Sequence, residues 1–473
     1  MKINSKILKE LKKRKITAIA HDSRSVESGS VFFVLEGKNF DIFSCLPSIE
    51  KKVALFIVQK KNKTKFNSLI RKKPVIFVND IEKIYRQSVD WFYNFKSSDF
   101  KFVGVTGTNG KTTITTLVYY FLKSIKIRSS LIGTVNYLIG SKKVKAEHTT
   151  PDYLALRKLF KIANSEKVKF IIMEVSSHAI DQNRVAGIDF SVCAFTNLTR
   201  DHLDYHKTMK SYFFAKKKLF FSNKKAKAII NNDDSYGRVL LSQLNEPISY
   251  GLKSGVDFKA ENISLSKENS QFDLVCKSGR ISVLTSLLGR HNICNILAAG
   301  AIVSSLGFSL KSFVRFIHSF RLVNGRMEAV AADIFLDYAH TPDALKRVLL
   351  SLREIGYKKI ICCFGCGGNR DKGKRARMGK IADKYADFTI ITSDNPRNEN
   401  SLKIISDIER GFTGKNYMIV SDRKAAIAKA IKVKARYSQA CLLVAGKGHE
   451  KYQIIGEKKI LFSDKKVIKK YGN

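Results

Sequence analysis

The sequence predicts an α/β protein with three domains, and three observations support this fold class. The 473 residues allow about three domains of ordinary size. Apolar runs typical of buried strands alternate with helix-like segments along the chain, which favours parallel sheets covered by helices. A glycine-rich turn at 104–110 joins one such run to an amphipathic segment, as in nucleotide-binding sheets. We therefore expect a central P-loop ATPase-like parallel sheet and a C-terminal Rossmann-like domain.

Three groups of strand-like runs define the predicted domains. Residues 1–98 form an N-terminal domain, with runs at 31–37, 53–58 and 74–78. Residues 99–322 form a central domain, with runs at 99–107, 170–177, 191–197 and 227–233 and a helix at 112–127. Residues 323–473 form a C-terminal domain, with runs at 333–339, 358–365, 387–394, 416–422 and 440–446.

The chain is strongly basic, with 85 Lys and Arg against 41 Asp and Glu and a formal net charge of +44. This charge would favour a nucleic-acid-binding ATPase, which is the alternative from a different class of protein. The basic residues are spread along the chain, however, and they form no patch interleaved with aromatic residues. We therefore expect a solvated basic surface and no nucleic-acid partner. Because 44% of the residues are apolar, wholesale disorder is excluded.

Targeting and membrane signals are weak. The N-terminal segment MKINSKILKELKKRK lacks the apolar stretch of a signal peptide, and the apolar runs are too short to span a bilayer. We therefore expect a cytoplasmic protein without membrane insertion. The close pair Cys363 and Cys366 lacks a second pair or a nearby histidine, so it indicates buried thiols more than a zinc site.

A phosphate-binding loop is predicted at 104–113, between a strand and a helix. Glycines let consecutive backbone N–H groups turn toward an anion, and the following helix directs its positive end at it. Lys111 adds a point charge, and the Thr112 hydroxyl can hold Mg²⁺, so ATP is the expected occupant. The loop departs from the usual P-loop pattern, because Val105 stands where the first glycine would fall. The alternative interpretation is a plain glycine turn between strand and helix.

Two further candidates follow the next strands of the central domain. Glu174 is expected at the C-terminal end of the strand that the run at 170–177 predicts, where α/β folds place their chemistry, and its carboxylate could ligate Mg²⁺. His202 lies in the segment 196–206, which follows the run at 191–197 and offers an imidazole and carboxylates. Taken singly, each histidine there is more typical of a hydrogen-bonded loop residue than of a metal ligand.

The segment TGTNGKTT at 106–113 resembles the phosphate loop of the Mur ligase family, the ATP-dependent amide-forming enzymes of peptidoglycan precursor synthesis. The related folylpolyglutamate synthases carry Gly-Ser after the lysine, where this chain has Thr112-Thr113. The resemblance implies a three-domain Mur ligase architecture, in which 1–98 binds the UDP-substrate, 99–322 binds ATP and 323–473 binds the incoming amino acid.

The resemblance also implies the catalytic residues Lys111, Glu174, His202 and Lys216. Thr112 and Glu174 correspond to ligands of one Mg²⁺, and Glu174 and His202 to ligands of a second. Lys216 corresponds to a lysine that reacts with CO₂ to give N6-carboxylysine, an anionic oxygen ligand that suits Mg²⁺ better than an ammonium. Three adjacent lysines are present, and the match of the flanking Ala215 and Leu219-Phe220 selects Lys216.

Two sets of binding residues follow from the same resemblance. The ATP-binding set is Gly107, Thr108, Asn109, Gly110, Lys111, Thr112, Thr113, Asn292, Asn295, Arg326, Asp337 and His340. The set for the UDP-muramoyl-dipeptide is Ser23, Thr149, Thr150, Ser176, Gln182 and Arg184.

The amino-acid set contains Arg370, Asp394, Asn395, Arg397, Gly446 and Glu450. Meso-diaminopimelate carries a distal carboxylate and a distal ammonium, so its site needs guanidinium donors and acids. Arg370 and Arg397 could clamp the carboxylate, and Asp394 and Glu450 could receive the ammonium. Burying arginines against plain lysine, which lacks that carboxylate, would leave charge unpaired. In the family, the sequence DNPR at 394–397 goes with diaminopimelate.

The resemblance therefore implies ATP-dependent addition of meso-2,6-diaminopimelate to UDP-N-acetylmuramoyl-L-alanyl-D-glutamate through an acyl phosphate. The expected cofactors are Mg²⁺ and the carboxylated Lys216, and the expected assembly is a monomer. Two alternatives stay open at this stage, a folylpolyglutamate synthase-like ligase and a Mur ligase that adds L-lysine.

Overall fold

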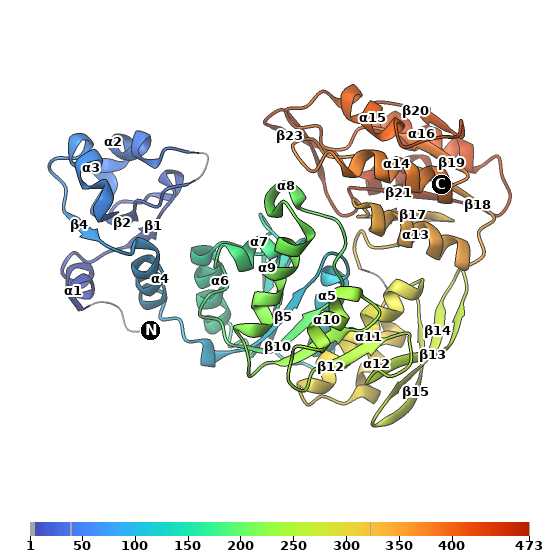
Figure 1. The fold of residues 1–473 in the computed structure, drawn as a ribbon, viewed down its shortest axis with the longest axis horizontal. Helices are drawn as coiled ribbons and strands as arrows, with labels where there is room; N and C mark the ends of the chain where they lie inside the picture. Colours follow the sequence, from blue (N-terminus) through green and yellow to red (C-terminus); the bar gives the residue numbers. More distant parts are fainter. Residues whose placement is uncertain (1–4, 38–39, 322, 473) are drawn as a thin grey trace. The chain divides into compact units, whose positions relative to one another are not determined.

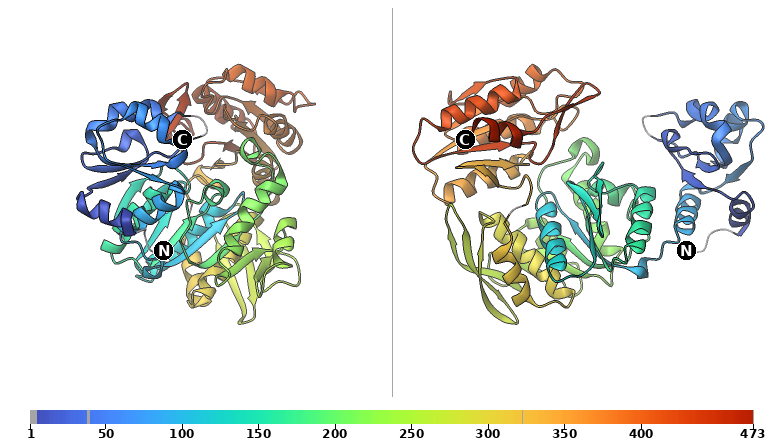
Figure 2. Two further views of the ribbon diagram at one scale, coloured as in Figure 1. Left: turned by 60° about the vertical axis from the view of Figure 1, so that its left-hand side comes forward. Right: turned by 180° about the vertical axis from the view of Figure 1, so that it is seen from behind.

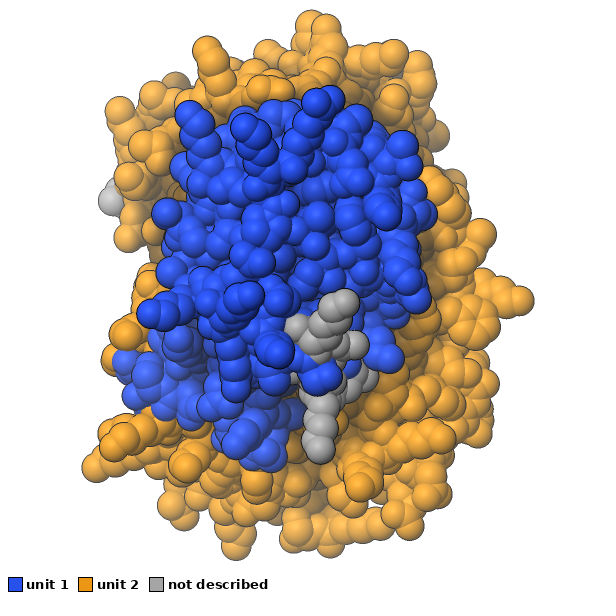
Figure 3. Space-filling view, turned by 90° about the vertical axis from the view of Figure 1, so that its left-hand side faces the viewer, with its two compact units in different colours: residues 1–99, 151–166 blue, residues 100–150, 167–473 orange. Residues whose placement is uncertain are grey.

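The computed structural model describes residues 5–37, 40–321 and 323–472. Its contacts divide the chain into two compact units, coloured separately in Figure 3. Unit 1 contains Met1–Asp99 and Pro151–Glu166, and unit 2 contains Phe100–Thr150 and Lys167–Asn473. A segment from the range predicted for the central domain thus packs with unit 1.

Unit 1 is built on a four-stranded parallel sheet with the order β1-β2-β3-β4. Its elements are α1 (Ser5–Lys13), β1 (Ala18–Ala20), β2 (Ser30–Phe33), α2 (Leu46–Ile49), β3 (Val53–Gln59), α3 (Lys63–Leu69), β4 (Val75–Val78), α4 (Ile81–Phe92) and α6 (Tyr153–Ser165). The three predicted strands are present.

Helix α6 is fixed to α4 by one buried polar cluster. Arg157 is fully buried, and its Nε donates to Oδ1 of Asp90 at 2.8 Å. The Tyr153 hydroxyl donates to the same oxygen at 2.8 Å, and the Phe95 and Phe160 rings stack with centroids 5.3 Å apart. A buried arginine needs such a partner, because an unpaired buried charge is costly. These contacts explain why α6 belongs to unit 1.

The first part of unit 2 is an eleven-stranded sheet with the order β15-β14-β13-β12-β11-β10-β5-β9-β6-β7-β8. Its strands are β5 (Lys101–Thr106), β6 (Ser129–Ile132), β7 (Asn136–Ile139), β8 (Lys142–Lys145), β9 (Phe170–Glu174), β10 (Phe190–Phe195), β11 (Lys227–Asn231), β12 (Ile248–Gly251), β13 (Phe258–Leu265), β14 (Ser270–Cys276) and β15 (Gly279–Thr285). The middle of the sheet, from β13 to β6, is parallel, and both ends are antiparallel.

The helices of this part are α5 (Lys111–Ser124), α7 (Ser177–Asp181), α8 (Leu203–His206), α9 (Met209–Phe221), α10 (Ser235–Leu241), α11 (Arg290–Ser305) and α12 (Leu310–Ser319). Helices α5, α11 and α12 bury their apolar faces in one core with β5, β9 and β10. Figure 2 shows this part of the chain in cyan, green and yellow. The carboxyl ends of these parallel strands face the site described below.

The last part of unit 2 is a six-stranded sheet with the order β16-β17-β21-β18-β19-β20, parallel except for β16. Its elements are β16 (Glu328–Ala331), β17 (Ile334–Asp337), α13 (Pro342–Glu354), β18 (Lys359–Phe364), α14 (Lys374–Tyr385), β19 (Phe388–Ile391), α15 (Ser401–Glu409), β20 (Tyr417–Ile419), α16 (Arg423–Lys434), β21 (Ala440–Ala445), the hairpin β22 (Tyr452–Ile455) and β23 (Lys458–Leu461), and α17 (Asp464–Tyr471). Helices α13, α14 and α15 pack on one face of this sheet and α16 and α17 on the other. Figure 1 shows this part of the chain in orange and red. The predicted α/β fold class with parallel sheets is confirmed.

Candidate active site

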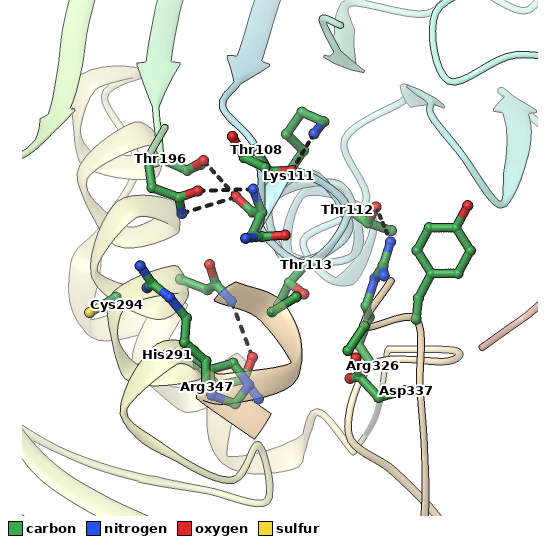
Figure 4. Close-up of a pocket in the computed structure, with 18 of the residues that line it drawn as sticks. Thr108, Lys111, Thr112, Thr113, Thr196, His291, Cys294, Arg326, Asp337 and Arg347 are labelled. Carbon is green, nitrogen blue, oxygen red and sulfur yellow. Dashed lines mark hydrogen bonds between the residues drawn. The ribbon is translucent and has the colours of Figure 1, made fainter. Parts of the chain in front are cut away.

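The loop between β5 and α5 has the conformation of a phosphate cradle. Gly107 and Gly110 have φ values of 144° and 88°, and α5 begins at Lys111. A Cβ on Gly107 would lie 1.8 Å from Oγ1 of Thr196, so only glycine fits there. Thr196 donates to the Asn109 carbonyl at 2.6 Å (Figure 4). Thr196, which directly follows β10, therefore fixes the conformation of the loop, and the N-terminus of α5 faces the cavity.

Two lysines donate to one carbonyl of this loop. Lys111 Nζ lies 2.9 Å from the Gly107 oxygen and 2.8 Å from the Thr108 oxygen. Lys216 Nζ, from α9, lies 2.8 Å from the same Gly107 oxygen. Burial lowers the pKa of Lys216 well below its ordinary value, and the Lys111 cation lowers it further. Lys216 is thus held behind the loop in surroundings that disfavour its charged form.

A cavity of about 210 Å³ lies in front of the loop. All predicted ATP-binding residues except Gly107 border it, namely Thr108, Asn109, Gly110, Lys111, Thr112, Thr113, Asn292, Asn295, Arg326, Asp337 and His340. Thr149, Glu174 and His202 border it too. Residues from both sheets of unit 2 thus form one site, and Figure 4 shows Arg326 donating to the Thr112 hydroxyl at 3.0 Å.

Glu174 is buried at the end of β9 and bonded on both oxygens by one residue. The Thr134 N–H donates to Oε1 at 2.8 Å, and the Thr134 hydroxyl donates to Oε2 at 3.0 Å. The Thr134 and Thr149 hydroxyls lie 3.1 Å apart. Sequence reasoning missed Thr134, because its role depends on the β6–β7 turn meeting the end of β9.

His202 and its neighbour Asp201 also border the cavity. Burial lowers the pKa of His202 to about 3, although Asp201 opposes the shift, so the imidazole is neutral near pH 7. Oδ2 of Asp201 lies 3.4 Å from Nε2 of His202 and 3.7 Å from Nε2 of His340. Asp201 is therefore a site residue that sequence reasoning did not select, although it stands beside His202 in the chain.

Among the described residues, no group of three or more His, Cys, Asp or Glu side chains lies together as a ready metal site. Cys363 and Cys366 are buried free thiols, and burial raises the pKa of each to about 12. In the ranges that the structure describes, no helix has the length and apolar character needed to cross a bilayer.

The predicted acceptor residues of unit 2 form one hydrogen-bonded network next to Glu174. The Thr150 hydroxyl donates to the Glu174 carbonyl at 2.8 Å and accepts from the Ser176 N–H at 3.0 Å. Arg184 Nη1 donates to the Thr150 carbonyl at 2.9 Å, and Arg184 Nε donates to Oε1 of Gln182 at 3.0 Å. The structure thus brings these four together, and Ser23 begins a short 3₁₀ turn in unit 1.

The predicted amino-acid residues lie together outside this cavity, on the last strands' carboxyl ends. Asp394 and Asn395 follow β19, Gly446 follows β21, and a Cβ on Gly446 would lie 2.9 Å from Oδ2 of Asp394. Nδ2 of Asn395 donates to Oε2 of Glu450 at 2.9 Å. Lys447, which sequence reasoning did not select, joins both.

The two arginines of this set differ in exposure. Arg397 is half-buried, has a φ of 51° and donates to the Gly368 carbonyl at 2.9 Å. Arg370 is exposed on the preceding loop. Burial lowers the pKa of Arg397, and the Arg370 cation adds to that shift. Arg370 Nη1 donates to the Asn369 carbonyl at 3.3 Å, next to the Gly368 carbonyl that Arg397 contacts.

Comparison with known proteins shows the family of this chain. Residues 105–303 match the Mur ligase middle domain, and residues 325–448 match the glutamate ligase domain of Mur ligases. The chain is 40% identical over 463 residues to UDP-N-acetylmuramoyl-L-alanyl-D-glutamate--2,6-diaminopimelate ligase 1 of Clostridium acetobutylicum, covering 96% of this chain and 94% of that protein. It is 40% identical over 478 residues to the UDP-N-acetylmuramoyl-L-alanyl-D-glutamate--2,6-diaminopimelate ligase of Lawsonia intracellularis, covering 98% of each.

The chain is also similar to a solved structure of a UDP-N-acetylmuramoyl-L-alanyl-D-glutamate--2,6-diaminopimelate ligase, with a TM-score of 0.65 and 29% sequence identity. The match covers 96% of this chain and 94% of the solved chain. The predicted resemblance and its architecture are confirmed by these matches. The chain belongs to the Mur ligase family.

Proposed function

We propose that this chain is the ATP-dependent ligase that adds meso-2,6-diaminopimelate to UDP-N-acetylmuramoyl-L-alanyl-D-glutamate in peptidoglycan precursor synthesis. One observation carries this function most directly. The cavity in front of the phosphate loop contains Lys111 and Glu174, and a separate cluster on the same unit combines Arg370 and Arg397 with two acids. Relatives of 40% identity over nearly the whole chain are named for this reaction.

The reaction divides into two displacements. The D-glutamyl γ-carboxylate attacks the γ-phosphorus of ATP, an oxygen–phosphorus bond forms, and ADP leaves. Lys111 and the N-terminus of α5 stabilise the charge that develops on the phosphoryl oxygens. The amine of diaminopimelate then attacks the acyl carbon, loses a proton and expels phosphate. Both steps need a site that excludes water, because an acyl phosphate hydrolyses readily.

The donors around the cavity fit Mg²⁺ that arrives with ATP. This ion keeps several waters and takes one or two protein carboxylates together with phosphate oxygens, so it needs no ready cluster of three ligands. Glu174, Thr112 and neutral His202 would hold it. When bound, Mg²⁺ supplies positive charge to the phosphoryl oxygens.

Lys216 is suited to become N6-carboxylysine. Its buried amine has a lowered pKa, and only the neutral amine can add to the carbon of CO₂ with loss of a proton. The modified side chain would supply an anionic oxygen ligand. The unmodified ammonium would instead lie beside Lys111, which burial and repulsion disfavour.

The remaining residues are assigned by position. Thr149, Thr150, Ser176, Gln182 and Arg184 would hold the acceptor's peptide end beside Glu174, since their network adjoins that carboxylate.

The uridine end is assigned to residues 1–98 with Ser23, ATP to 99–322, and diaminopimelate to 323–473 with Arg370, Asp394, Asn395, Arg397, Gly446 and Glu450. We further propose a cytoplasmic monomer.

Product mass tests this function directly. Purified protein is incubated with ATP, Mg²⁺, the UDP-linked acceptor and either meso-diaminopimelate or L-lysine, with each component omitted in turn. The expected result is a gain of one diaminopimelate residue with release of ADP and phosphate. A gain with lysine alone would overturn the assignment of Arg370 and Arg397. No product with either amino acid would overturn the function and bring back the folate-type ligase.

A further inference from the structure

Lys447 is a fully buried cation beside the amino-acid cluster. It lies in the loop after β21, between Gly446 and Gly448, which have φ values of 110° and 50°. A side chain at position 446 would be strained and would meet Asp394. The loop therefore turns sharply, and the whole Lys447 side chain is buried with no exposed surface.

The Lys447 ammonium closes a triangle of hydrogen bonds. Nζ donates to Oε2 of Glu450 at 2.8 Å and to Oδ1 of Asn395 at 3.0 Å. The third side is the 2.9 Å bond from Nδ2 of Asn395 to the same Oε2. Hydrogen bonds that involve charged groups are the strong ones, so this triangle fixes the orientation of the Glu450 carboxylate.

The triangle also fastens the neighbouring hairpin. The Ile454 N–H in β22 donates to Oδ1 of Asn395 at 2.9 Å, and the Tyr452 ring lies 5.7 Å from Nζ of Lys447. The Arg397 N–H donates to the Ile454 carbonyl at 3.1 Å. Lys447 thus connects the segment that carries Arg397 with the loop that carries Glu450.

We propose that Lys447 is a positioning residue that orients Glu450 at the amino-acid site and supplies the positive charge that favours meso-diaminopimelate over L-lysine. This inference rests on the proposed function and names a further determinant of its amino-acid specificity.

The charge argument follows from the residues of the cluster. Arg370, Arg397 and Lys447 are cations, and Asp394 and Glu450 are anions, so the empty cluster has one positive charge in excess. Diaminopimelate with a neutral attacking amine has two carboxylates and one ammonium, a net charge of −1. Lysine in the same state has one of each and is neutral. Only diaminopimelate therefore brings the cluster to charge balance.

Without Lys447, the cluster would be neutral when empty and would match L-lysine instead. Lys447 and Glu450 bond each other, so the effect of Lys447 on specificity is separable from its effect on orientation by changing both residues.

Three variants test the proposal in steady-state kinetics with each amino acid. Lys447→Met makes the cluster neutral, and we expect the KM for diaminopimelate to rise about 10- to 100-fold, the loss of one charged hydrogen bond. The KM for ATP and the kcat at saturating diaminopimelate should stay near the wild-type values. The preference for diaminopimelate over lysine, as a ratio of kcat/KM values, should fall. Lys458→Met, at an exposed lysine of β23, is the matched control.

The other two variants separate charge from orientation and remain informative where Lys447→Met fails to fold. Glu450→Gln adds one more positive charge in excess and should increase the preference for diaminopimelate. Lys447→Met/Glu450→Gln restores one excess charge, so the preference should return toward the wild-type value while the KM for both amino acids stays high. Equal preference in wild type, Glu450→Gln and the double variant would overturn the charge role. Proportional losses for ATP and both amino acids in the variants would overturn the positioning role.

The wild-type reaction distinguishes a failure of the role of Lys447 from a failure of the proposed function. Wild-type protein that forms product with diaminopimelate, together with variants of unchanged preference and unchanged KM, would overturn the role of Lys447 alone. Wild-type protein that forms no product with either amino acid would overturn the proposed function and this inference with it.

Discussion

Replacing Arg423 by methionine should loosen the strand ends that carry the amino-acid cluster. Arg423 begins α16 and Asp464 begins α17, and both side chains are fully buried. Nε and Nη2 of Arg423 donate to the two oxygens of Asp464 at 2.8 and 2.7 Å. The same guanidinium donates to the carbonyls of Ser393 and Ala445 at 3.2 and 2.9 Å. These two residues directly precede Asp394 and Gly446.

The expected loss of stability follows from the buried groups that the substitution leaves without their hydrogen-bond donor. Removing one partner of a buried ion pair leaves an uncompensated buried charge and costs about 3–5 kcal/mol. Here the Asp464 carboxylate loses two donors, and the Ser393 and Ala445 carbonyls lose one each. A loss of that size multiplies the population of locally opened molecules by about 150 to 5,000.

Amide hydrogen exchange is the suitable assay, because the chain's single tryptophan, Trp91, lies in unit 1 and does not report on this region. Exchange in peptides from β19 and β21 should accelerate by the factor above, and exchange in β5 should not change. Arg423→Met/Asp464→Leu removes both charges and should recover most of the protection. Acceleration of less than about tenfold in Arg423→Met would refute the reasoning, since it corresponds to only about 1.4 kcal/mol.

Three further predictions concern the cavity. Lys111→Met should lower kcat about 10²- to 10³-fold in an ADP-release assay, because a charged donor to the phosphoryl oxygens is lost, and a rate near wild type would contradict this role. Removing dissolved CO₂ should abolish activity and added bicarbonate should restore it, with Lys216→Arg inactive in both cases; full activity without CO₂ would exclude the carbamate. Burial lowers the pKa of His291 from 6.5 to about 4, so the unfolded chain binds its proton first and stability falls as the pH drops from about 6.5 toward about 4. Thermal midpoints of His291→Gln should fall less steeply over that interval, and parallel curves would contradict the assignment.

Much of the fold could be predicted because the local sequence pattern indicates its central strands. The runs that became β5, β9 and β10 are mostly apolar, since strands covered on both faces bury nearly every side chain. Thr106 ends β5, Glu174 ends β9, and Thr196 directly follows β10. The position of Glu174 followed from that pattern alone, because the last residue of a buried strand lies at the functional edge of a parallel sheet.

The strands at the sheet margins could not be predicted in the same way. Strand β8 has the sequence KKVK, and β23 has the sequence KKIL with all four residues exposed. Such strands gain their stability from backbone pairing with β7 and β22, which a local pattern does not contain. The packing of α6 on unit 1 is likewise set by Arg157 and Asp90, which are far apart in the sequence.

In the candidate site too, some residues could be predicted from local sequence and others could not. Residues chosen by motif, such as Thr112 and Asn295, border the cavity, because each motif follows a strand or begins a helix at the functional edge. The location of Lys216 behind the Gly107 carbonyl and the bond between Lys447 and Glu450 depend on tertiary contacts. Sequence alone offered three adjacent lysines and a loop with an unassigned lysine.

Two hydrogen bonds join the central part of unit 2 to its C-terminal part beside the phosphate loop. Asn109 of the phosphate loop donates to Asp343 of α13 at 3.1 Å, and Arg326 donates to Thr112 at 3.0 Å. In the proposed reaction, a nucleotide in the cavity would touch both parts at once, so its binding energy would be available to hold them together. Because the amino-acid cluster lies on the C-terminal part alone, holding the parts together also fixes the distance from the incoming amine to Glu174. Acyl phosphate formation and amine attack thus share one geometric requirement, which the phosphate loop and α13 set jointly.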